Sequence, residues 1–472
     1  MTLKKIQTHF ESPYVPSTAP ASKAAMMKEI GITDEMELYR DIPDELIYKE
    51  ALDLPEGPYP DEFSIKQHMT SMLKKNANAS EYSYFLGAGC ARHHTPAVCD
   101  EMTGRGEFLT AYFGATTDDR GKWQAIWEYQ AQMSELLDVD FCGFPQYDGP
   151  CSLSHAILIA TRITGKKKVL VPASASPMNM MVVNNYTDGV IDRQAELVRV
   201  NYDKKTGLLD MEDLRQKLDK DTAAVVIENP TFFGMIETQG PEIGSLAKKA
   251  GAEFIVYADP ISLGVMEAPS NYGATMTAGD LHSLGGHLAA GGHQAGFLGL
   301  SDDRKYLSQF KDLAVSIAPT VVDGEYSFVW YNFEECSYGI REEANEYTGS
   351  ACNLWAIHSA VYMTSMGPRG FEEVGDTIMK RCQYAANELT KLPGVRILFK
   401  GPFFKEFVVD FSDTDKTVAE INRALLAYKI IGGLDLSKDF PELGQSALWC
   451  VTETNTQAEI DALVAALRTV LA

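Results

Sequence analysis

The chain has 472 residues, of which 45% are hydrophobic and 23% charged, a composition typical of globular proteins rather than collagen-like or disordered ones. Lys and Arg number 42 against 65 Asp and Glu, which leaves a net charge of −23. Because so acidic a surface repels phosphate backbones and anionic lipids, the charge argues against nucleic-acid and membrane-surface partners.

The eight cysteines include no C-x-x-C pair, and they are too few for a disulfide framework in a chain of this length. We therefore expect reduced thiols in a reducing compartment. Neither a secretory signal nor an apolar run long enough to span a membrane is recognisable. The sequence predicts a cytoplasmic protein.

Residues 1–80 are polar and carry scattered prolines, so we expect an N-terminal arm of short helices and linkers that packs over another domain or subunit. From residue 120 the pattern of apolar residues changes, and an amphipathic pattern predicts a helix over 122–137. Short apolar runs then alternate with helical patterns. The expected strands are 168–172, 196–200, 223–227 and 253–257, and the expected helices between them include 211–218 and 242–250. This alternation predicts a parallel sheet covered on both faces, within a large domain at 81–345.

A smaller α+β domain is expected at 346–472. Its predicted helices are 351–362, 372–389 and 417–428, and its predicted strands are 395–399, 404–411 and 447–451. Gly432 and Gly433 are expected to stop the third helix, and a Thr456-x-x-Glu459 capping box to open the last one. A large α/β domain followed by a small α+β domain fits the aspartate-aminotransferase type of fold.

Several short motifs follow one another along the chain. They are Phe85-Leu86-Gly87-Ala88-Gly89 with His93 and Pro96-Ala97-Val98, Thr110-Ala111-Tyr112, Gln124 to Gln130, Tyr147-Asp148-Gly149, Asn229 to Gly234, Ala258 to Gly264, Arg341-Glu342-Glu343, Asn353-Leu354, Met366-Gly367-Pro368, Ile430 to Leu434, Pro441-Glu442-Leu443 and Cys450 to Glu453. In this order and spacing the chain resembles subunit 1 of the split glycine dehydrogenase (decarboxylating), the P-protein of the glycine cleavage system. The resemblance runs from about residue 30 to the C-terminus.

The resemblance implies an α/β fold of the fold-type I class of pyridoxal-phosphate-dependent transferases. In this family pyridoxal phosphate serves to decarboxylate glycine, and the aminomethyl group passes to the lipoyl arm of the H-protein. In split systems the Schiff-base lysine belongs to subunit 2, and subunit 1 has the same fold with a degenerate cofactor site. The implied assembly is an α2β2 heterotetramer with subunit 2, in which this chain is not active alone.

A missing lysine agrees with that picture. The Schiff-base lysine is expected a few tens of residues after Asp259, yet residues 274–300 contain none. We therefore expect no Schiff-base lysine in this chain and pyridoxal phosphate on the partner subunit.

Three residues are expected near the degenerate cofactor site: Asp148, Asp259 and His282. Asp259 stands where a carboxylate would pair with the pyridine nitrogen, but without the lysine a cap or hydrogen bond at a strand end is the better interpretation. Asp148 precedes a candidate phosphate-binding helix start, where Pro150 removes one N–H donor. Proline is also common in the first turn of helices that bind no ligand.

The segment after Tyr112 departs from the family. The family normally reads Thr-Pro-Tyr-Gln there, whereas this chain reads Phe113-Gly114-Ala115-Thr116-Thr117-Asp118-Asp119-Arg120-Gly121. The resemblance suggests that the loop reaches the partner's cofactor, which makes Asp118, Asp119 and Arg120 candidates for substrate selection. Either the loop only packs at the interface and its sequence has changed without a change of substrate, or the substrate differs from glycine.

The candidate catalytic residues are His93 and His94, for proton relay or a carboxylate contact, and Tyr112, for contact with substrate or cofactor. His282, His287 and His293 are five and six residues apart, which matches neither an i, i+4 helical pair nor an H-x-x-E-H motif. Packing is the first interpretation for them and a proton relay the second, and no metal site is expected.

The sequence thus predicts an enzyme subunit that completes the active site of a lysine-bearing partner. Two alternatives stay open. A related pair could act on another small amine or amino acid, or the chain could be a non-catalytic scaffold whose cofactor site has decayed.

Overall fold

The computed structural model describes residues 16–48, 61–109, 120–188, 193–289, 291–292, 295–331, 333–344 and 352–472. The chain divides into two compact units, residues 1–77 and 78–472. The first unit carries helices α1 (Pro20–Ile30) and α2 (Glu62–Leu73), neither of which has a buried residue. Pro20 stands in the first turn of α1 and Gly31 ends it in the left-handed conformation, as proline and glycine favour at these positions.

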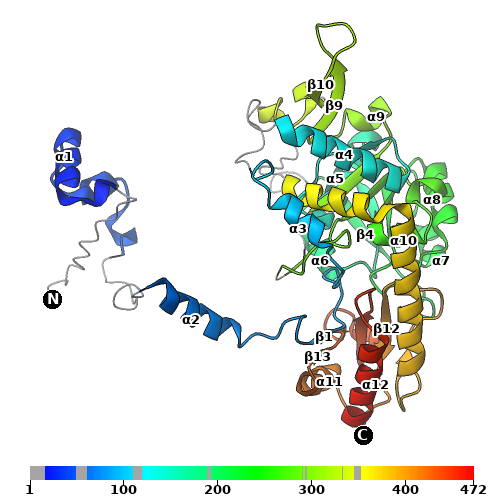
Figure 1. The fold of residues 1–472 in the computed structure, drawn as a ribbon. Coiled ribbons are helices and arrows are strands. Elements are labelled where there is room, and N and C mark those ends of the chain that lie inside the picture. The colour runs from blue at the N-terminus through cyan, green and yellow to red at the C-terminus, as the bar shows by residue number, and fades with distance from the viewer. Residues whose placement is uncertain are drawn as a thin grey trace. The chain divides into compact units, whose positions relative to one another are not determined.

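The second unit, drawn as part of the ribbon in Figure 1, is built on a seven-stranded sheet with the order β2-β8-β7-β6-β5-β3-β4. The strands are β2 (Phe141–Cys142), β3 (Lys168–Pro172), β4 (Glu196–Val200), β5 (Thr222–Asn229), β6 (Glu253–Ala258), β7 (Met276–Asp280) and β8 (Gly296–Leu300). The pairs from β4 through β3, β5 and β6 to β7 are parallel, whereas β8 and β2 join antiparallel at one side. The expected mostly parallel sheet is confirmed.

Alternate residues of the central strands enter two separate cores. On β5, Ala224 and Val226 pack with α5 (Gly149–Thr164) and α6 (Pro177–Thr187), while Val225 and Ile227 pack with α7 (Met211–Lys217) and α8 (Gly240–Ala250). Because both faces are covered by helices, these strands need apolar residues on both sides, which explains their continuous apolar runs. The predicted helix at 122–137 is α4 (Arg120–Leu137).

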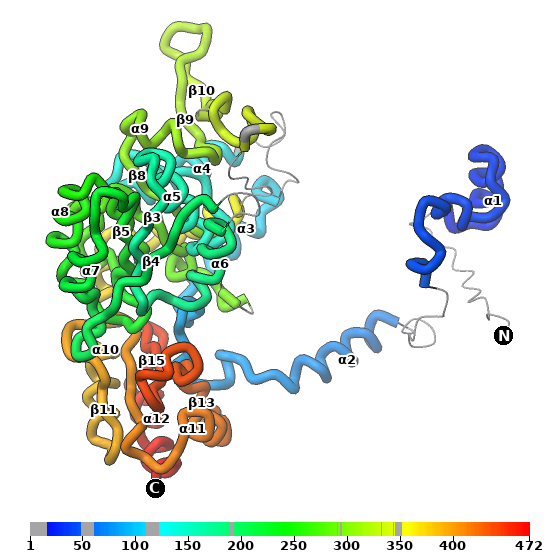
Figure 2. The backbone as a smooth tube through the Cα atoms, turned by 180° about the vertical axis from the view of Figure 1, so that it is seen from behind, coloured from blue at the N-terminus to red at the C-terminus, as the bar shows by residue number. Residues whose placement is uncertain are grey.

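The C-terminal elements gather at one end of the second unit (Figure 2). A four-stranded antiparallel sheet, β11-β12-β15-β14, is formed by β11 (Arg396–Ile397), β12 (Glu406–Asp410), β14 (Leu434–Asp435) and β15 (Ser446–Cys450). Helices α11 (Val418–Leu425) and α12 (Gln457–Leu471) accompany it, and the capping box of Thr456 and Glu459 at the start of α12 is confirmed.

The two helices expected at 351–362 and 372–389 are the two parts of α10 (Asn353–Leu389), which a kink divides where Gly367 leaves helical geometry before Pro368. Two other expectations for this region need correction. The strand expected at 395–399 is only two residues long. Gly432 and Gly433 do not stop the third helix, because Lys429 already ends it in the left-handed conformation and β13 (Ile430–Ile431) follows.

Smaller elements complete the second unit. β1 (Ser83–Tyr84) pairs in parallel with β13, so a segment that the sequence assigned to the large domain hydrogen-bonds to the C-terminal region. Helices α3 (Ala97–Thr103) and α9 (Arg304–Leu307) also belong to this unit, as does the hairpin of β9 (Ala314–Pro319) and β10 (Tyr326–Tyr331). Among the described residues, none of the helices is both long and apolar enough to cross a membrane.

Candidate functional site: a pocket closed by its own lysine

A cavity of about 120 Å³ lies where strands β5, β6 and β7 end. Each strand supplies a carboxylate to its wall: Glu228 near the end of β5, Asp259 directly after β6, and Asp280 as the last residue of β7. In sheets of this kind ligands bind at the carboxyl ends of the strands, so this is the expected place for a functional site. The volume is small beside the roughly 300–1,000 Å³ of typical ligand pockets.

One side of the cavity, which we call the closed pocket, is formed by a segment from the C-terminal region. Lys405, which just precedes β12, has φ of 64° and directs its ammonium group to an ion pair with Asp259. The neighbouring Glu406 accepts a hydrogen bond from the backbone N–H of Ala88 at 2.5 Å. A Cβ atom on Gly234 would lie 1.8 Å from the Glu406 carbonyl oxygen, so only glycine allows the loop after β5 to approach this closely.

Both side chains of the ion pair between Lys405 and Asp259 are charged. Burial works against both charges, but the attraction of Asp259 raises the pKa of Lys405 above its ordinary value, and the attraction of Lys405 keeps the pKa of Asp259 below its own. Asp259 also accepts a hydrogen bond from the Ser283 hydroxyl at 2.6 Å. A lysine held as an ammonium ion is not a nucleophile, so Lys405 does not replace the missing Schiff-base lysine.

In the part of the chain that the structure describes, the other two strand-end carboxylates form no ion pair. Burial raises the pKa of Glu228 to about 7, although the backbone N–H groups of Ser176 and Phe232 donate to it. Burial also raises the pKa of Asp280 to about 7. The pocket therefore holds one cation among several carboxylates, which is unfavourable for a phosphorylated ligand.

The helix start that could cradle a phosphate is satisfied by the protein itself. At the beginning of α5, the Gly149 N–H donates to Asp280 at 3.2 Å and the Cys151 N–H donates to the Asp148 carboxylate at 2.8 Å. Pro150 has no N–H, and the Ser152 N–H donates to the Asp148 carbonyl at 3.1 Å. A carboxylate cap thus occupies the place of an anionic ligand.

Two of the predicted histidines lie beside this pocket. The buried His93 places Nδ1 3.0 Å from the Glu453 carboxylate, and its ring lies 6.2 Å from that of His282. The attraction of His93 overcomes burial and lowers the pKa of Glu453 to about 2, while burial lowers the pKa of His282 to about 4. His94 differs from both, because its side chain is exposed and only its backbone N–H binds Glu453.

The remaining predicted residues are placed only in part. Tyr112, Asp118, Asp119 and His293 lie outside the described residues. Arg120, expected in the loop, begins helix α4. Asp259 and His282 line the cavity, and Asp148 caps the neighbouring helix α5.

Sequence reasoning missed Glu228, Asp280, Lys405 and Glu406. The first two end apolar strands, where a lone carboxylate after a buried run is a usable signal. Lys405 and Glu406 stand between Phe404 and Phe407 in a predicted strand. Two adjacent charges in an apolar run point to opposite faces of a strand, so both cannot face solvent on a sheet packed on one side, and this was a second signal.

Solved structures agree with this fold. A sphingosine-1-phosphate lyase from Burkholderia pseudomallei is 16% identical, with a TM-score of 0.64 over 89% of this chain and 93% of its own. The mixed α/β architecture with the pocket at the strand ends is the fold of the fold-type I class.

The family follows from closer matches. The chain belongs to the glycine cleavage system P-protein family, whose model matches residues 13–467. A probable glycine dehydrogenase (decarboxylating) subunit 1 from Pyrococcus horikoshii is 36% identical over 97% of this chain and 99% of its own length. An inhibitor-bound glycine decarboxylase (P-protein) structure is 29% identical, with a TM-score of 0.84 over 98% of this chain and 100% of the other.

Proposed function

We propose that this chain is the first of two homologous subunits of a glycine-decarboxylating enzyme of the glycine cleavage system. Its partner carries pyridoxal phosphate and the Schiff-base lysine. The family assignment and the relatives named subunit 1 support this proposal. The cofactor supplies the electron sink for decarboxylation in the partner's site, and this chain completes that site.

One observation supports the different roles of the two subunits: in this chain the groups that would bind the cofactor are already bonded to other side chains of the same chain. Lys405 forms an ion pair with Asp259, the carboxylate that the resemblance would assign to the pyridine nitrogen. Asp148 and Asp280 accept hydrogen bonds from the helix N–H groups that a phosphate would need. The residues present therefore do not fit pyridoxal phosphate. No step of the reaction is assigned to this pocket.

The contribution of this chain lies in the segment that leads into α3. Glu453 holds that segment by binding the His93 ring and the His94 N–H, the latter at 2.6 Å. This fixes the backbone while the His94 imidazole stays exposed. We assign to His94 a contact with the substrate carboxylate or a proton relay in the partner's site, with His93 as a positioning residue. Tyr112, Asp118 and Asp119, together with Arg120 at the start of α4, are proposed to line the same site.

The proposed assembly is an α2β2 heterotetramer that accepts the lipoyl H-protein. The test is to co-express this chain with a tagged lysine-bearing homologue and to measure subunit ratio, pyridoxal-phosphate content and exchange of bicarbonate into the glycine carboxyl group. We expect equal amounts of both subunits, with about one cofactor per pair and none on this chain alone. His94→Ala should lower exchange at least about tenfold without dissociating the pair.

Other results would favour the alternatives. A stoichiometric, cofactor-loaded pair that does not exchange glycine would indicate another small amine or amino acid as substrate. A homo-oligomer that never binds the homologue would support a scaffold. Cofactor on this chain alone would contradict the interpretation of its pocket.

A further inference from the structure

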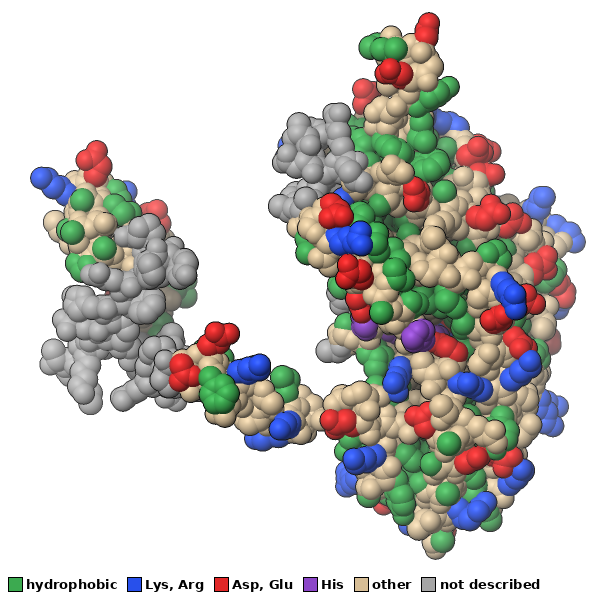
Figure 3. Space-filling view, viewed as in Figure 1, with side chains coloured by type: hydrophobic (Ala, Val, Ile, Leu, Met, Phe, Trp, Pro, Cys, Tyr) green, Lys and Arg blue, Asp and Glu red, His purple; other side chains and the backbone are tan. Residues whose placement is uncertain are grey.

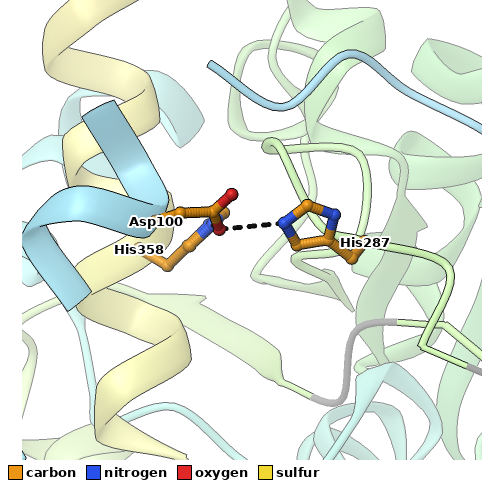
Figure 4. Close-up of side chains that lie close together, drawn as sticks. All are labelled: Asp100, His287 and His358. Carbon is orange, nitrogen blue, oxygen red and sulfur yellow. Dashed lines mark hydrogen bonds and ion pairs between the residues drawn. The ribbon is translucent and has the colours of Figure 1, made fainter. Parts of the chain in front are cut away.

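A second cluster of titratable side chains lies away from the closed pocket, where three distant segments meet. Asp100 lies on α3, His287 in the connection between β7 and β8, and His358 on α10 (Figure 4). His287 Nε2 lies 2.9 Å and His358 Nε2 lies 3.5 Å from Asp100 Oδ1. The spacing of His282, His287 and His293 in the sequence did not reveal this cluster, because Asp100, His287 and His358 are far apart along the chain.

We propose that Asp100, His287 and His358 form a binding site for a divalent first-row transition-metal ion such as Zn²⁺. The proposal departs from the sequence expectation of no metal site, and it does not depend on the proposed function. Two imidazole nitrogens and one carboxylate oxygen are the donors that Zn²⁺ or Fe²⁺ accepts, whereas Mg²⁺ and Ca²⁺ prefer oxygen donors alone.

The distances suit such an ion. One potential ligand atom from each residue lies within 4.8 Å of the other two. With metal–ligand bonds of about 2.0–2.2 Å, the donors of a tetrahedral ion are separated by about 3.3–3.6 Å. The separations of 2.9 and 3.5 Å from Asp100 already lie close to that range.

Both histidine Nε2 atoms lie close to the same Asp100 oxygen. A metal ion between the three groups would replace these contacts with coordination bonds.

The framework around the cluster is fixed, whereas one side is open. The Thr95 hydroxyl donates to the Gly285 carbonyl at 2.9 Å, which ties the chain before α3 to the segment carrying His287. A Cβ atom on Gly285, which has φ of 80°, would lie 2.6 Å from the Tyr362 ring on α10. The side chains of Asp100 and His287 are 56% and 55% exposed, so an ion and a fourth, water ligand can enter. Figure 3 shows histidine side chains at the surface of this unit beside acidic ones.

The test uses the untagged full-length chain, because a histidine tag binds the same ions. After treatment with a chelator, the chain is titrated with Co²⁺ by visible absorption and with Zn²⁺ by calorimetry. We expect about one ion per chain, with micromolar or tighter affinity and the visible bands of Co²⁺ coordinated by nitrogen and oxygen. His287→Ala and Asp100→Asn should each weaken binding at least about tenfold.

Two matched controls separate this site from other donors. His94→Ala removes an exposed histidine outside the cluster, and Cys90→Ser removes a half-buried thiol; neither should change the affinity. Near-ultraviolet thiolate bands that disappear in Cys90→Ser would overturn the proposal. So would binding unchanged in both His287→Ala and Asp100→Asn, or no binding below about 100 μM. The exposed His287 and the near-isosteric Asp100→Asn change are chosen because both variants should fold.

Discussion

The closed pocket and the Asp100–His287–His358 cluster both bring carboxylates and nitrogen bases together from distant segments, but they differ in burial. In the pocket the charges are enclosed, and the chain supplies its own counter-ion in Lys405. In the cluster two of the three side chains are more than half exposed. Burial therefore makes the first site complete without a ligand, whereas the second keeps donors within reach of one.

The difference has a physical cause. An isolated charge in a protein interior costs several kcal/mol, so an unliganded pocket that retains Asp259 needs a permanent cation. At the surface, water provides that compensation and an ion pair contributes roughly 0–1 kcal/mol. The same donor chemistry can thus be a structural element in one place and a binding site in another.

The largest effect is expected from removing the counter-ion in the pocket. Lys405→Met leaves Asp259 buried without its cation and should lower the free energy of unfolding by about 3–5 kcal/mol. Methionine is unbranched like lysine, so the backbone at this position, with φ of 64°, is not changed by the substitution. Urea unfolding followed by circular dichroism measures the loss.

A double variant and a surface pair provide the controls. Lys405→Met with Asp259→Leu should recover most of the loss, because neither charge is then left alone. Lys380→Met breaks an exposed pair with Asp376 and should cost less than about 0.5 kcal/mol. Equal costs at the two lysines would contradict the distinction between the buried and exposed sites.

The second prediction concerns Glu228, whose pKa burial raises to about 7. Between its unfolded value near 4.5 and 7, the folded chain binds more protons, so its stability falls as the pH rises and the penalty is complete above pH 7. Glu228→Gln should therefore be more favourable at pH 8 than at pH 5, by about 2–3 kcal/mol. Unfolding curves of both proteins at the two pH values give this difference. A pH-independent effect would show that the carboxyl group is not protonated in the fold.

The pattern of apolar residues was enough to predict the large sheet, since strands covered on both faces need continuous apolar runs such as that of β5. The helices expected at 351–362 and 372–389 correspond to the two parts of α10 on either side of Gly367. The angle between those parts was not predictable, because it depends on how each packs against the rest of the unit.

Site residues could be predicted where neighbouring residues in the sequence identify them, and not where they pair with residues far along the chain. Asp259 follows an apolar strand, and Asp148 precedes a helix with proline in its first turn, so both could be placed from nearby residues. Lys405 lies 146 residues from Asp259 along the chain, and His358 comes from a different helix than Asp100. Such pairings depend on the tertiary fold, which local patterns do not specify.

A third, smaller effect concerns the cap that closes the phosphate position of the pocket. Asp148→Ala removes the acceptor of the Cys151 N–H and should cost about 1 kcal/mol. Thr456→Ala, at the start of α12, removes a comparable cap far from the pocket and should cost about the same. Thermal unfolding compares the two. A much larger loss at Asp148 would mean that this carboxylate also holds the walls of the pocket together.

The smallest effect is expected at the exposed cluster in the absence of metal. Asp100 has a lowered pKa, so its contribution to stability is present above its unfolded value and disappears as the pH falls through the folded one. Because the group is exposed, His287→Ala should change the free energy of unfolding by no more than about 1 kcal/mol at pH 7 with chelator present. Urea unfolding under the conditions used for Lys405→Met makes the two values comparable. A loss as large as that at Lys405 would show that the cluster is part of the folded core, as the pocket pair is, and that its donors are not free to take up an ion.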